Sequence, residues 1–325
     1  MSIFNFQLLP QIFCYMSLTR GSKVLNSYFW QMKRWVVFVL LAIAFYGCEK
    51  TINFDLDEAS TVLVVDGTIE NGQPPFIILS NSYNYFAELT PDLLEKSFIH
   101  DAIITLSNGS STHKLKEYFI TNDSNNRVYY YSIDSTNLAT AIIGEFGKQY
   151  TLDISSGGKS YRAVTTIPQL SKQIDSLWWK LSPNNPDTTL VVLSGRTTDP
   201  PGLGNYIRYF TRVDDGPFLP GLNSVYDDQI IDGTTYSIEI EKGIDRNEEI
   251  DPDTYSFFSK GDTATVKLCN IDKVTYEFWR TMEYSYSSIG NPFSSPTKVS
   301  GNVSGGALGY FGGYAVQYKT LIIPK

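Results

Sequence analysis

The pattern of apolar and polar positions from residue 61 onward is that of short strands separated by turns. TVLVVDGTIE, FIILS and IHDAIITLSNG alternate or run apolar for a few residues and then reach Gly, Pro or Asn. VYYYSID and YTLDISSGGKSYRAVTTIP continue the same rhythm. Short runs bounded by turn residues are typical of β-strands joined in hairpins. Residues 61–170 therefore predict an N-terminal β-sandwich domain of the immunoglobulin-like or fibronectin-like kind.

A second β domain is predicted over residues 171–325. TTLVVLSGRTTD, NYIRYFTRV, TYSIEIEK and TATVKL indicate at least four further strands. One stretch, NIDKVTYEFWRTMEYSYSS, instead predicts a helix near 271–286, with Asn270 as its N-cap. Its apolar face at helical spacing consists of Ile271, Val274, Phe278 and Met282. The predicted fold class is all-β, with two β-sandwich-like domains and one short helix in the second.

An apolar run near the N-terminus predicts an export signal. MKR precedes the twelve residues WVVFVLLAIAFY, and GCEK follows them directly. A membrane-spanning helix needs about 20 apolar residues, so this run ends too early for a comfortable span. A basic start, a short apolar stretch and a small residue before the cut are the parts of a signal peptide. We therefore predict a signal peptide over 32–47.

The cysteine after this run, Cys48, is the predicted lipid-attachment residue. The GC pair resembles the lipobox of bacterial lipoproteins, whose cysteine carries diacylglycerol, although Phe45 and Tyr46 are bulkier than the usual lipobox residues. Plain secretion and an uncleaved anchor are the alternatives. Residues 48–60 are then a polar tether. Residues 1–31 precede a complete signal peptide, so they indicate a start codon assigned too far upstream.

Charge and composition exclude several classes of function. The whole chain has a net charge of −8, and a chain beginning at Cys48 would carry 22 basic and 34 acidic groups, a net charge of −12. This balance repels nucleic-acid phosphates, so nucleic acid is not an expected partner. The three cysteines cannot form a disulfide framework. His100 and His113 are the only histidines, which excludes a His-rich metal site.

One acidic stretch, DRNEEIDPD, is a candidate calcium loop. It places an oxygen-bearing side chain at every second position, as calcium loops do: Asp245, Asn247, Glu249, Asp251 and Asp253. The glycine of an EF-hand turn is absent and Pro252 interrupts the stretch. A solvated acidic loop is the alternative interpretation. No other cofactor is predicted.

The sequence favours a non-enzymatic role without settling the question. SSGGKS ends like a phosphate-binding loop but lies between two predicted strands, so a hairpin turn is the better interpretation. The chain contains no G-x-S-x-G motif. Catalysis by two carboxylates stays open, because any two of the many acidic residues could meet in the fold. Aromatic residues that could contact a ligand are Tyr83, Tyr85, Phe86, Trp178, Trp179, Tyr284 and Tyr286.

The order of these features resembles a known family of Bacteroidota outer-membrane lipoproteins, catalogued as domain of unknown function 4249. The resemblance rests on GCEK, VLVVDGTIENGQPPFIILSNSYNYF, IHDAIITLSNG and FWRTMEYSYSSIGNPFSSPTKVSGNVSGGALGYFGGYA. It implies a lipid-anchored protein of the outer membrane, exposed at the cell surface, that assists a TonB-dependent receptor. It carries over no catalytic residues. A surface hydrolase acting on glycan or peptide, and a structural or adhesion protein, are the alternative functions.

Overall fold

The computed structural model describes residues 61–83, 90–121, 126–182 and 186–289, together with 291, 293, 295 and 297–325. The predicted upstream segment, signal peptide and tether, with Cys48, lie outside the described residues. Among the described residues, no helix is long and apolar enough to cross a membrane.

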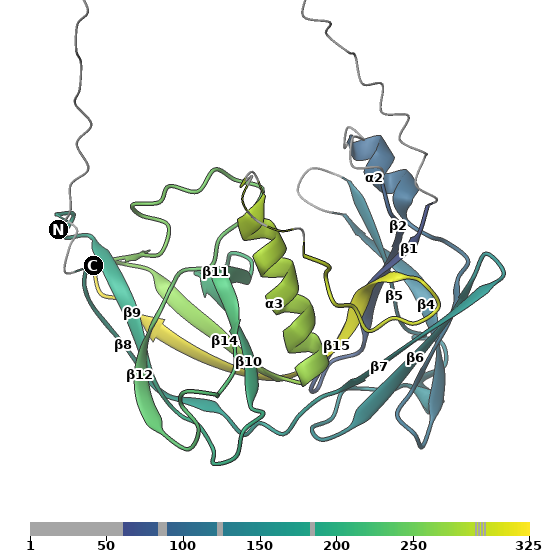
Figure 1. Cartoon of the computed structure of the whole chain (residues 1–325), viewed down its shortest axis with the longest axis horizontal. Helices are drawn as coiled ribbons and strands as arrows, with labels where there is room; N and C mark the ends of the chain where they lie inside the picture. Colours follow the sequence, from purple (N-terminus) through teal and green to yellow (C-terminus); the bar gives the residue numbers. More distant parts are fainter. Residues whose placement is uncertain are drawn as a thin grey trace, which may run out of the picture. The chain divides into compact units, whose positions relative to one another are not determined.

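Strands dominate the described chain (Figure 1), which confirms the predicted all-β class. The strands of the first region are β1 (Leu63–Glu70), β2 (Phe76–Asn81), β3 (Ile103–Ser107), β4 (Thr112–Thr121), β5 (Arg127–Ile133), β6 (Gln149–Ser156) and β7 (Lys159–Thr166). Those of the second region are β8 (Gln173–Leu181), β9 (Leu190–Thr198), β10 (Tyr206–Val213), β11 (Leu219–Tyr226), β12 (Thr235–Ile240), β13 (Phe258–Ser259) and β14 (Thr263–Ile271). The remaining elements are helix α2 (Pro91–Ser97), the short 3₁₀ turn η1 (Leu138–Thr140), helix α3 (Lys273–Ser288) and strand β15 (Leu308–Ile322).

Most of these strands form one path of eleven hydrogen-bonded neighbours. Its order is β11-β10-β14-β15-β1-β2-β5-β4-β3-β6-β7. A second sheet of four strands contains β12, β9 and β13, with β8 also paired to β9. Strands β1 and β15 run parallel, whereas β14 and β15 run antiparallel. The first region and the second region are therefore linked through β15.

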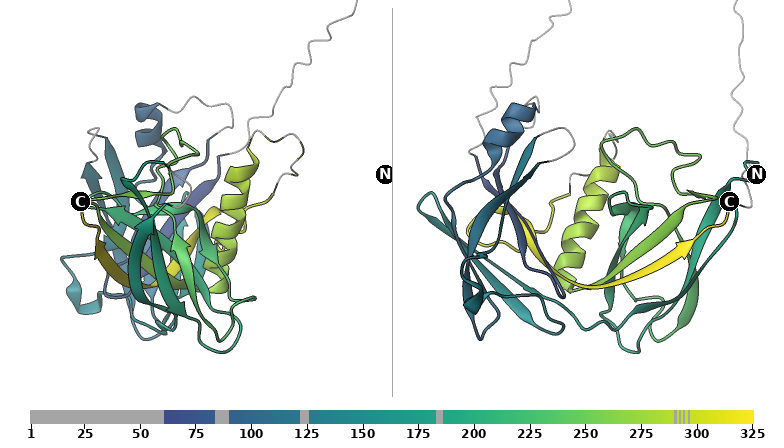
Figure 2. Two further views of the ribbon diagram at one scale, coloured as in Figure 1. Left: turned by 90° about the vertical axis from the view of Figure 1, so that its left-hand side faces the viewer. Right: turned by 180° about the vertical axis from the view of Figure 1, so that it is seen from behind.

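Strand β15 belongs to both regions. Its residues 308–314 pair with β1, and its residues 314–322 pair with β14, as can be followed in yellow in Figures 1 and 2. Glycine is needed midway, because a Cβ on Gly313 would lie 2.6 Å from the Thr166 carbonyl oxygen. The domain boundary predicted near residue 170 stays a prediction, and the two regions share this strand.

The predicted hairpin turns are present. Gly157 and Gly158 both have positive φ, of 57° and 74°, and connect β6 to β7 across the Ser156–Lys159 pair. SSGGKS is therefore a hairpin turn, as predicted. Asn108 caps the turn between β3 and β4, where its side-chain oxygen accepts hydrogen bonds from the two N–H groups of Ser110 and Ser111.

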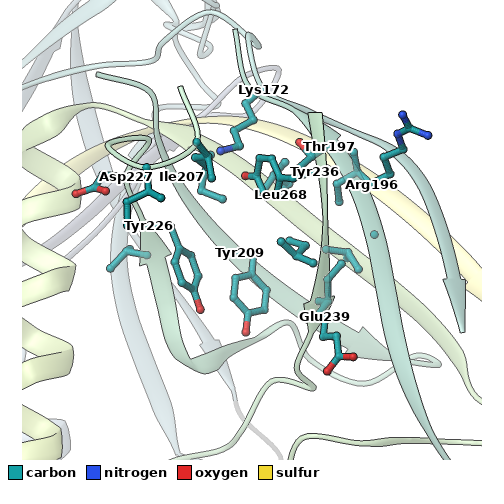
Figure 3. Close-up of a pocket in the computed structure, with 18 of the residues that line it drawn as sticks. Lys172, Arg196, Thr197, Ile207, Tyr209, Tyr226, Asp227, Tyr236, Glu239 and Leu268 are labelled. Carbon is teal, nitrogen blue, oxygen red and sulfur yellow. The ribbon is translucent and has the colours of Figure 1, made fainter. Parts of the chain in front are cut away.

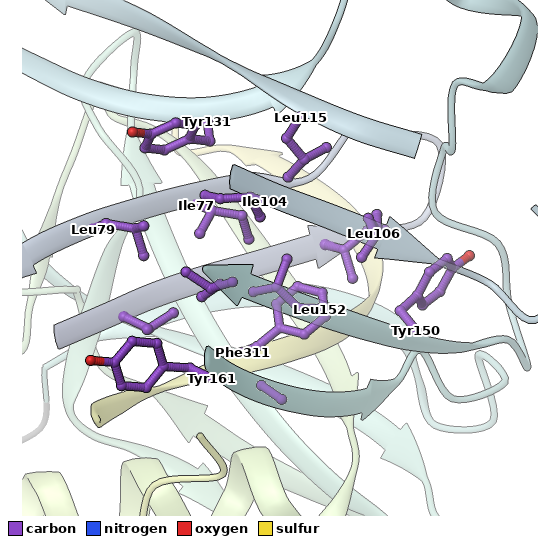
Figure 4. Packing of buried hydrophobic residues seen from close by; sticks show 14 of the residues in the cluster. Ile77, Leu79, Ile104, Leu106, Leu115, Tyr131, Tyr150, Leu152, Tyr161 and Phe311 are labelled. Atoms are coloured by element: carbon purple, nitrogen blue, oxygen red, sulfur yellow. The ribbon is translucent and has the colours of Figure 1, made fainter. Parts of the chain in front are cut away.

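The core of the first region is filled by large apolar side chains (Figure 4). Alternate residues of β6 point inward, as the two-residue period of a strand requires. Tyr150 and Leu152 are fully buried there, and Ile104 of β3 is fully buried in the same cluster. Strand β15 adds Phe311, which is also fully buried among these side chains. The first region is thus completed by a residue that lies far downstream in the sequence.

Helix α3 confirms the predicted helix but begins two residues later than expected. Its N-cap is Asp272, whose Oδ1 accepts a hydrogen bond of 2.8 Å from the Thr275 N–H. Asn270, the predicted cap, lies in β14 instead. Asp272 Oδ2 also accepts hydrogen bonds from the hydroxyl of Thr165 and the N–H of Thr166. One side chain therefore starts the helix and fixes it to β7.

The buried face of α3 differs from the predicted one. Phe278 is buried as expected, but Val274 is 42% exposed and Ile271 belongs to β14. The helix packs on β10, β11 and β15. Along β14, Cys269 faces the helix cluster, whereas the neighbouring Leu268 faces the second sheet. The second region thus has a helix on one face of the large sheet and four strands on the other.

Candidate ligand-binding cavity and aspartate cluster

A cavity of about 480 Å³ lies between the second sheet and strands β10, β11 and β14. Its walls are mainly apolar, because strands on both sides direct alternate aliphatic side chains toward it. The aliphatic side chains that line it are Ile174, Ile207, Val225, Ile230, Ile231, Ile238, Ile240, Val266 and Leu268. The interior of the second region is therefore hollow where the interior of the first is filled.

Tyrosine hydroxyls give this apolar cavity a polar component. Tyr209 and Tyr226 lie side by side with ring centroids 6.2 Å apart, and Tyr236 lines the wall from β12 (Figure 3). Burial raises the pKa of Tyr226 to about 12, and burial likewise raises the pKa of Tyr209. Both phenols stay protonated at neutral pH. The Tyr226 hydroxyl donates to the carbonyl of Asn223, 3.1 Å away, and can accept a hydrogen bond from a bound molecule, whereas the Tyr209 hydroxyl can donate one.

A buried lysine points into one end of the cavity. Lys172 is fully buried, and Figure 3 shows its ammonium reaching toward Tyr236. The ammonium lies 5.2 Å from the centroid of the Tyr236 ring, within the range of a cation–π interaction. Asn270 holds the backbone of Lys172 by two hydrogen bonds of 2.9 Å, one to its N–H and one to its carbonyl. Strand β14 therefore fixes where this cation lies.

The ion-pair partner of Lys172, Asp199, belongs to a group of three acidic residues, which we call the aspartate cluster. It consists of Asp199, Asp228 and Asp232, each with a carboxylate oxygen within 4.8 Å of the others. Lys172 Nζ lies 2.9 Å from Asp199 Oδ1. Asp199 and Asp228 are buried, whereas Asp232 is exposed. The cluster thus places three negative charges beside one buried positive charge.

Two loops build the aspartate cluster. Asp199 directly follows β9, and its N–H donates to the carbonyl of Thr234, which immediately precedes β12. Asp228 and Asp232 lie in the turn that follows β11. The ends of three strands therefore converge on the cluster.

Backbone N–H groups orient two of the three carboxylates. Asp228 accepts hydrogen bonds from the N–H groups of Gly204 and Asn205, at 2.9 and 2.8 Å to Oδ2, and Asp232 Oδ1 accepts one of 2.6 Å from Gly202. Burial raises the pKa of the Asp228 carboxyl, but the combined hydrogen bonds from Asn205 and Gly204 outweigh it and hold the pKa below its usual value. Asp228 is therefore a carboxylate at neutral pH.

Asp199 has a different environment. Both of its carboxylate oxygens are buried, and neither accepts a hydrogen bond from the described residues. The contact with Lys172 is close enough for an ion pair, but its geometry is not that of a hydrogen bond. A buried carboxylate without hydrogen bonds is costly, so Asp199 has unused capacity to bind a further donor or cation.

The sequence matches the family described as domain of unknown function (DUF4249) over residues 49–320. The chain belongs to the DUF4249 family. A search of curated proteins finds no match to it.

The predicted calcium loop of the DUF4249 chain forms two local turns. Asp245 Oδ1 accepts hydrogen bonds from the backbone and side-chain nitrogens of Asn247, and Asp251 Oδ1 accepts one from the N–H of Asp253. Glu249 is exposed between them. Within the part of the chain that the structure describes, none of these carboxylates joins a group of three within 4.8 Å. Calcium binding by this loop stays a prediction.

The two histidines of the DUF4249 chain lie apart from the cavity lining. His113 is buried, with Nδ1 2.9 Å from the Thr140 hydroxyl and Nε2 accepting a hydrogen bond from the N–H of Asp134. Both ring nitrogens are thus engaged in holding a turn. His100 is exposed and contacts the carboxylate of Glu117.

The candidate aromatic residues that the structure describes lie on separate elements. Trp179 packs against the core of the second region, whereas its neighbour Trp178 is 37% exposed, as alternation along β8 requires. Tyr284 and Tyr286 are exposed on α3. The Tyr83 hydroxyl donates a hydrogen bond to the carbonyl of Leu93. Tyr85 and Phe86 lie outside the described residues.

Sequence reasoning missed Lys172 and the whole aspartate cluster. Asp199 occurs in TTDPPGLGN, and the other two aspartates occur in DDQIIDG. Proline and glycine mark both segments as turns, but nothing local indicates that the two turns meet. The cluster depends on the pairing of β9 with β12 and of β10 with β11, which sets distant loops side by side.

Proposed function

We propose that the chain is a non-enzymatic, lipid-anchored protein of the bacterial outer membrane that binds a small, mainly apolar molecule in its cavity. We further propose that it acts as an accessory to a TonB-dependent transporter, presenting or retaining that molecule. The cavity between the two sheets is the observation that carries the binding function.

The size and lining of the cavity support a binding role. Its volume of about 480 Å³ falls in the range of small-molecule sites, about 300–1,000 Å³. Aliphatic walls would take the apolar body of a ligand, and the Tyr209 and Tyr226 hydroxyls would orient a polar group on it. Lys172 adds one ammonium at the end of the cavity. The expected ligand is therefore mainly apolar, with polar groups placed to meet Lys172 and the tyrosine hydroxyls.

The anchor is supported by the sequence. The family match begins at residue 49, directly after Cys48, and the segment before that cysteine has the parts of an export signal. The lipobox-like pair and the resemblance to Bacteroidota lipoproteins support the outer membrane as the location. The association with a transporter rests on this resemblance.

A cavity-blocking variant tests the binding function. Ile238 lines the cavity and is 39% exposed, so Ile238→Trp would place a large ring across the cavity with little effect on the core. Ser237, the next residue of β12, points to the opposite side of the strand, and Ser237→Trp is the matched control.

The readout is the set of small molecules that remain with the protein. The three proteins are purified from outer membranes, extracted with organic solvent and compared by mass spectrometry. We expect a compound that accompanies the wild type and Ser237→Trp but is depleted at least about ten-fold with Ile238→Trp, the effect of losing about 1.4 kcal/mol of binding. Equal amounts in all three would contradict binding in the cavity.

Enzymatic turnover is the rival outcome of the same work. Asp227 and Glu239 are the carboxylates that line the cavity. Cleavage of a glycan or peptide that is lost in Asp227→Asn or Glu239→Gln would support a surface hydrolase in place of a binding protein. A deletion strain with normal growth on every substrate but weaker attachment between cells would instead support a structural role.

The anchor is tested by Cys48→Ser. This substitution removes the thiol that would carry the lipid, so a clickable fatty acid supplied to the cells should label the wild type and not the variant. Cys269→Ser is the matched control, because Cys269 is buried and should not affect labelling. Labelling of Cys48→Ser at the wild-type level would remove the basis for a lipoprotein.

The transporter partnership is tested by purification after cross-linking in intact cells. We expect an outer-membrane receptor to be captured with the wild type and with Ile238→Trp, since this substitution changes the surface only at the cavity. Absence of any receptor under all growth conditions would contradict the partnership while leaving ligand binding open.

A further inference from the structure

We propose that the aspartate cluster is a divalent-cation site and that calcium is the cation it fits best. The cluster joins Asp199, Asp228 and Asp232 at the end of the cavity, outside the acidic loop in which the sequence predicts calcium. This site is independent of the ligand proposed for the cavity, so either can hold without the other.

The spacing of the carboxylates fits a single calcium ion. Calcium binds oxygen ligands at about 2.3–2.6 Å, so two ligands on opposite sides of one ion lie about 4.8 Å apart or slightly more. One oxygen of each of the three aspartates lies within 4.8 Å of the others. These separations are of the size expected for oxygens that share one calcium ion.

The balance of charge points to a divalent cation. Three carboxylates lie together, and Lys172 forms an ion pair with one of them, Asp199, which leaves two negative charges without a cation in contact. Repulsion between carboxylates at this distance is large where two of them are buried. A monovalent ion would leave one charge unbalanced, whereas a divalent ion neutralises the group.

Asp199 provides a second, independent indication. It is fully buried, and its two carboxylate oxygens accept no hydrogen bond from any described residue. Lys172 approaches only Oδ1, so Oδ2 keeps its full capacity as a ligand. Buried polar atoms in native proteins are almost always satisfied, and a cation held by the cluster satisfies this one.

The remaining two aspartates are held in position for the same ion. N–H groups of Gly204 and Asn205 hold Asp228, and the N–H of Gly202 holds Asp232. Such hydrogen bonds orient metal ligands and raise affinity. Asp232 is exposed, which gives the ion a path from solvent to the two buried ligands.

The chemistry of the donors favours calcium over other metals. The three ligands are hard oxygens with no imidazole or thiolate among them, which argues against zinc and copper. Magnesium requires near-ideal octahedral geometry, whereas calcium accepts irregular sets of six to eight oxygens. Three carboxylates from two loops, completed by water, suit the less demanding ion.

Calorimetric titration with metal alone tests the proposal. The full chain, purified in detergent and treated with a chelator, is titrated with calcium chloride and separately with magnesium chloride. We expect one calcium site with a Kd of about 10⁻³ M or tighter, the range of extracellular calcium modules, and magnesium binding at least about ten-fold weaker. No calcium binding up to about 10 mM, well beyond that range, would overturn the proposal.

Two single substitutions assign the site. Asp232→Asn removes an exposed ligand and should weaken calcium binding at least about ten-fold, since even the loss of an outer partner of a metal site costs that much. Asp251→Asn makes the same chemical change in the acidic loop at 245–253, and we expect affinity within about two-fold of the wild type. The reverse result, with binding lost only in Asp251→Asn, would place calcium in that loop and overturn the assignment.

Thermal unfolding gives a second readout that also reports on folding. Calcium stabilises the folded state by mass action, so at about 100 times the Kd it should raise the Tm of the wild type and of Asp251→Asn. Asp232→Asn should unfold cooperatively, and its calcium-induced rise in Tm should be at most about half that of the wild type, because the same calcium concentration is at most about 10 times its own Kd. A calcium-induced rise in its Tm equal to that of the wild type would overturn the proposal.

Discussion

The first and second regions use the same β-strand pattern to build different interiors. In the first region, Tyr150, Leu152 and Phe311 fill the space between strands. In the second, strands β9, β10, β12 and β14 enclose a cavity of about 480 Å³ with a buried Lys172 at its end. Close packing is the ordinary state of a protein interior, so the second region departs from it.

This difference in packing separates the region that supplies most of the stability from the region that contains the cavity and the aspartate cluster. Each filled position of the first region gains dispersion contacts on all sides. The wall of the cavity lacks partners on one side, and the Lys172–Asp199 pair must be desolvated without full hydrogen bonding. Each buried side chain of the second region is therefore expected to contribute less to the free energy of unfolding than one in the first region.

The largest expected effect comes from breaking the buried ion pair. Lys172→Met leaves the Asp199 carboxylate buried without its cation, which should lower the free energy of unfolding by about 3–5 kcal/mol. Urea denaturation followed by circular dichroism measures this. A loss below about 1 kcal/mol would mean that the pair behaves like a surface ion pair.

A double variant sharpens the same comparison. Lys172→Met with Asp199→Leu removes both charges, and buried ion pairs replaced by apolar residues are often neutral in stability. We expect the double variant to regain most of the stability that the single variant loses. Equal stability of the single and double variants would show that the Asp199 carboxylate, buried without its lysine, does not lower the free energy of unfolding.

Matched isoleucines should lose different amounts of stability. Ile104→Ala in the filled core should cost about 2–5 kcal/mol, because it removes contacts and creates a cavity. Ile207→Ala in the wall should cost only about 1–2 kcal/mol, since the side facing the existing cavity has few contacts to lose. Equal losses from urea titration would show that the cavity wall is as tightly packed as the core.

The smallest expected effect is a change in how the free energy of unfolding depends on pH. The pKa of Asp228 is below its usual value, with burial opposed and outweighed by hydrogen bonds from Asn205 and Gly204. Its stabilisation is therefore present above the unfolded pKa, about 3.9, and is lost as the pH falls through the folded pKa. We expect Asp228→Asn to lose less stability than the wild type between about pH 5 and pH 3.

Asp134 in the first region is the control for that measurement. Hydrogen bonds from the Thr136 hydroxyl and N–H lower its pKa as well, but it lies on an exposed turn. Solvent screening keeps such surface effects small, so Asp134→Asn should follow the pH profile of the wild type closely. If Asp134→Asn changes the pH profile of stability more than Asp228→Asn does, the acid sensitivity comes from the first region and not from the second.

Features encoded by neighbouring residues were predictable from the sequence. The Gly157-Gly158 hairpin needs positive φ at both positions, and glycine supplies it directly. Helix α3 was predicted from apolar residues at helical spacing, with an error of two residues at its start. That error arose because Asn270 and Asp272 are both good caps, and the pairing of β14 with β10 and with β15 keeps Asn270 in a strand.

Features that join distant residues were not predictable. Asn71 accepts a hydrogen bond from the N–H of Val316, 245 positions away, and no local pattern indicates this contact. The aspartate cluster likewise depends on strand ends that meet only in the folded chain. The acidic loop at 245–253 is the opposite case, since both its regular spacing and the turns that its aspartates form are local in the sequence.

The shared strand β15 has a consequence for the order in which the protein can fold. A chain made from its N-terminus normally folds its domains in sequence, but the first region needs Phe311 to fill its core and residues 308–314 to cover the edge of β1. Strand β14 also needs β15 to complete its hydrogen-bonded pairing. Pairing over such separations is slow to form. Neither region therefore reaches its final packing until synthesis has passed residue 322, and the edges that β15 covers stay unpaired until then.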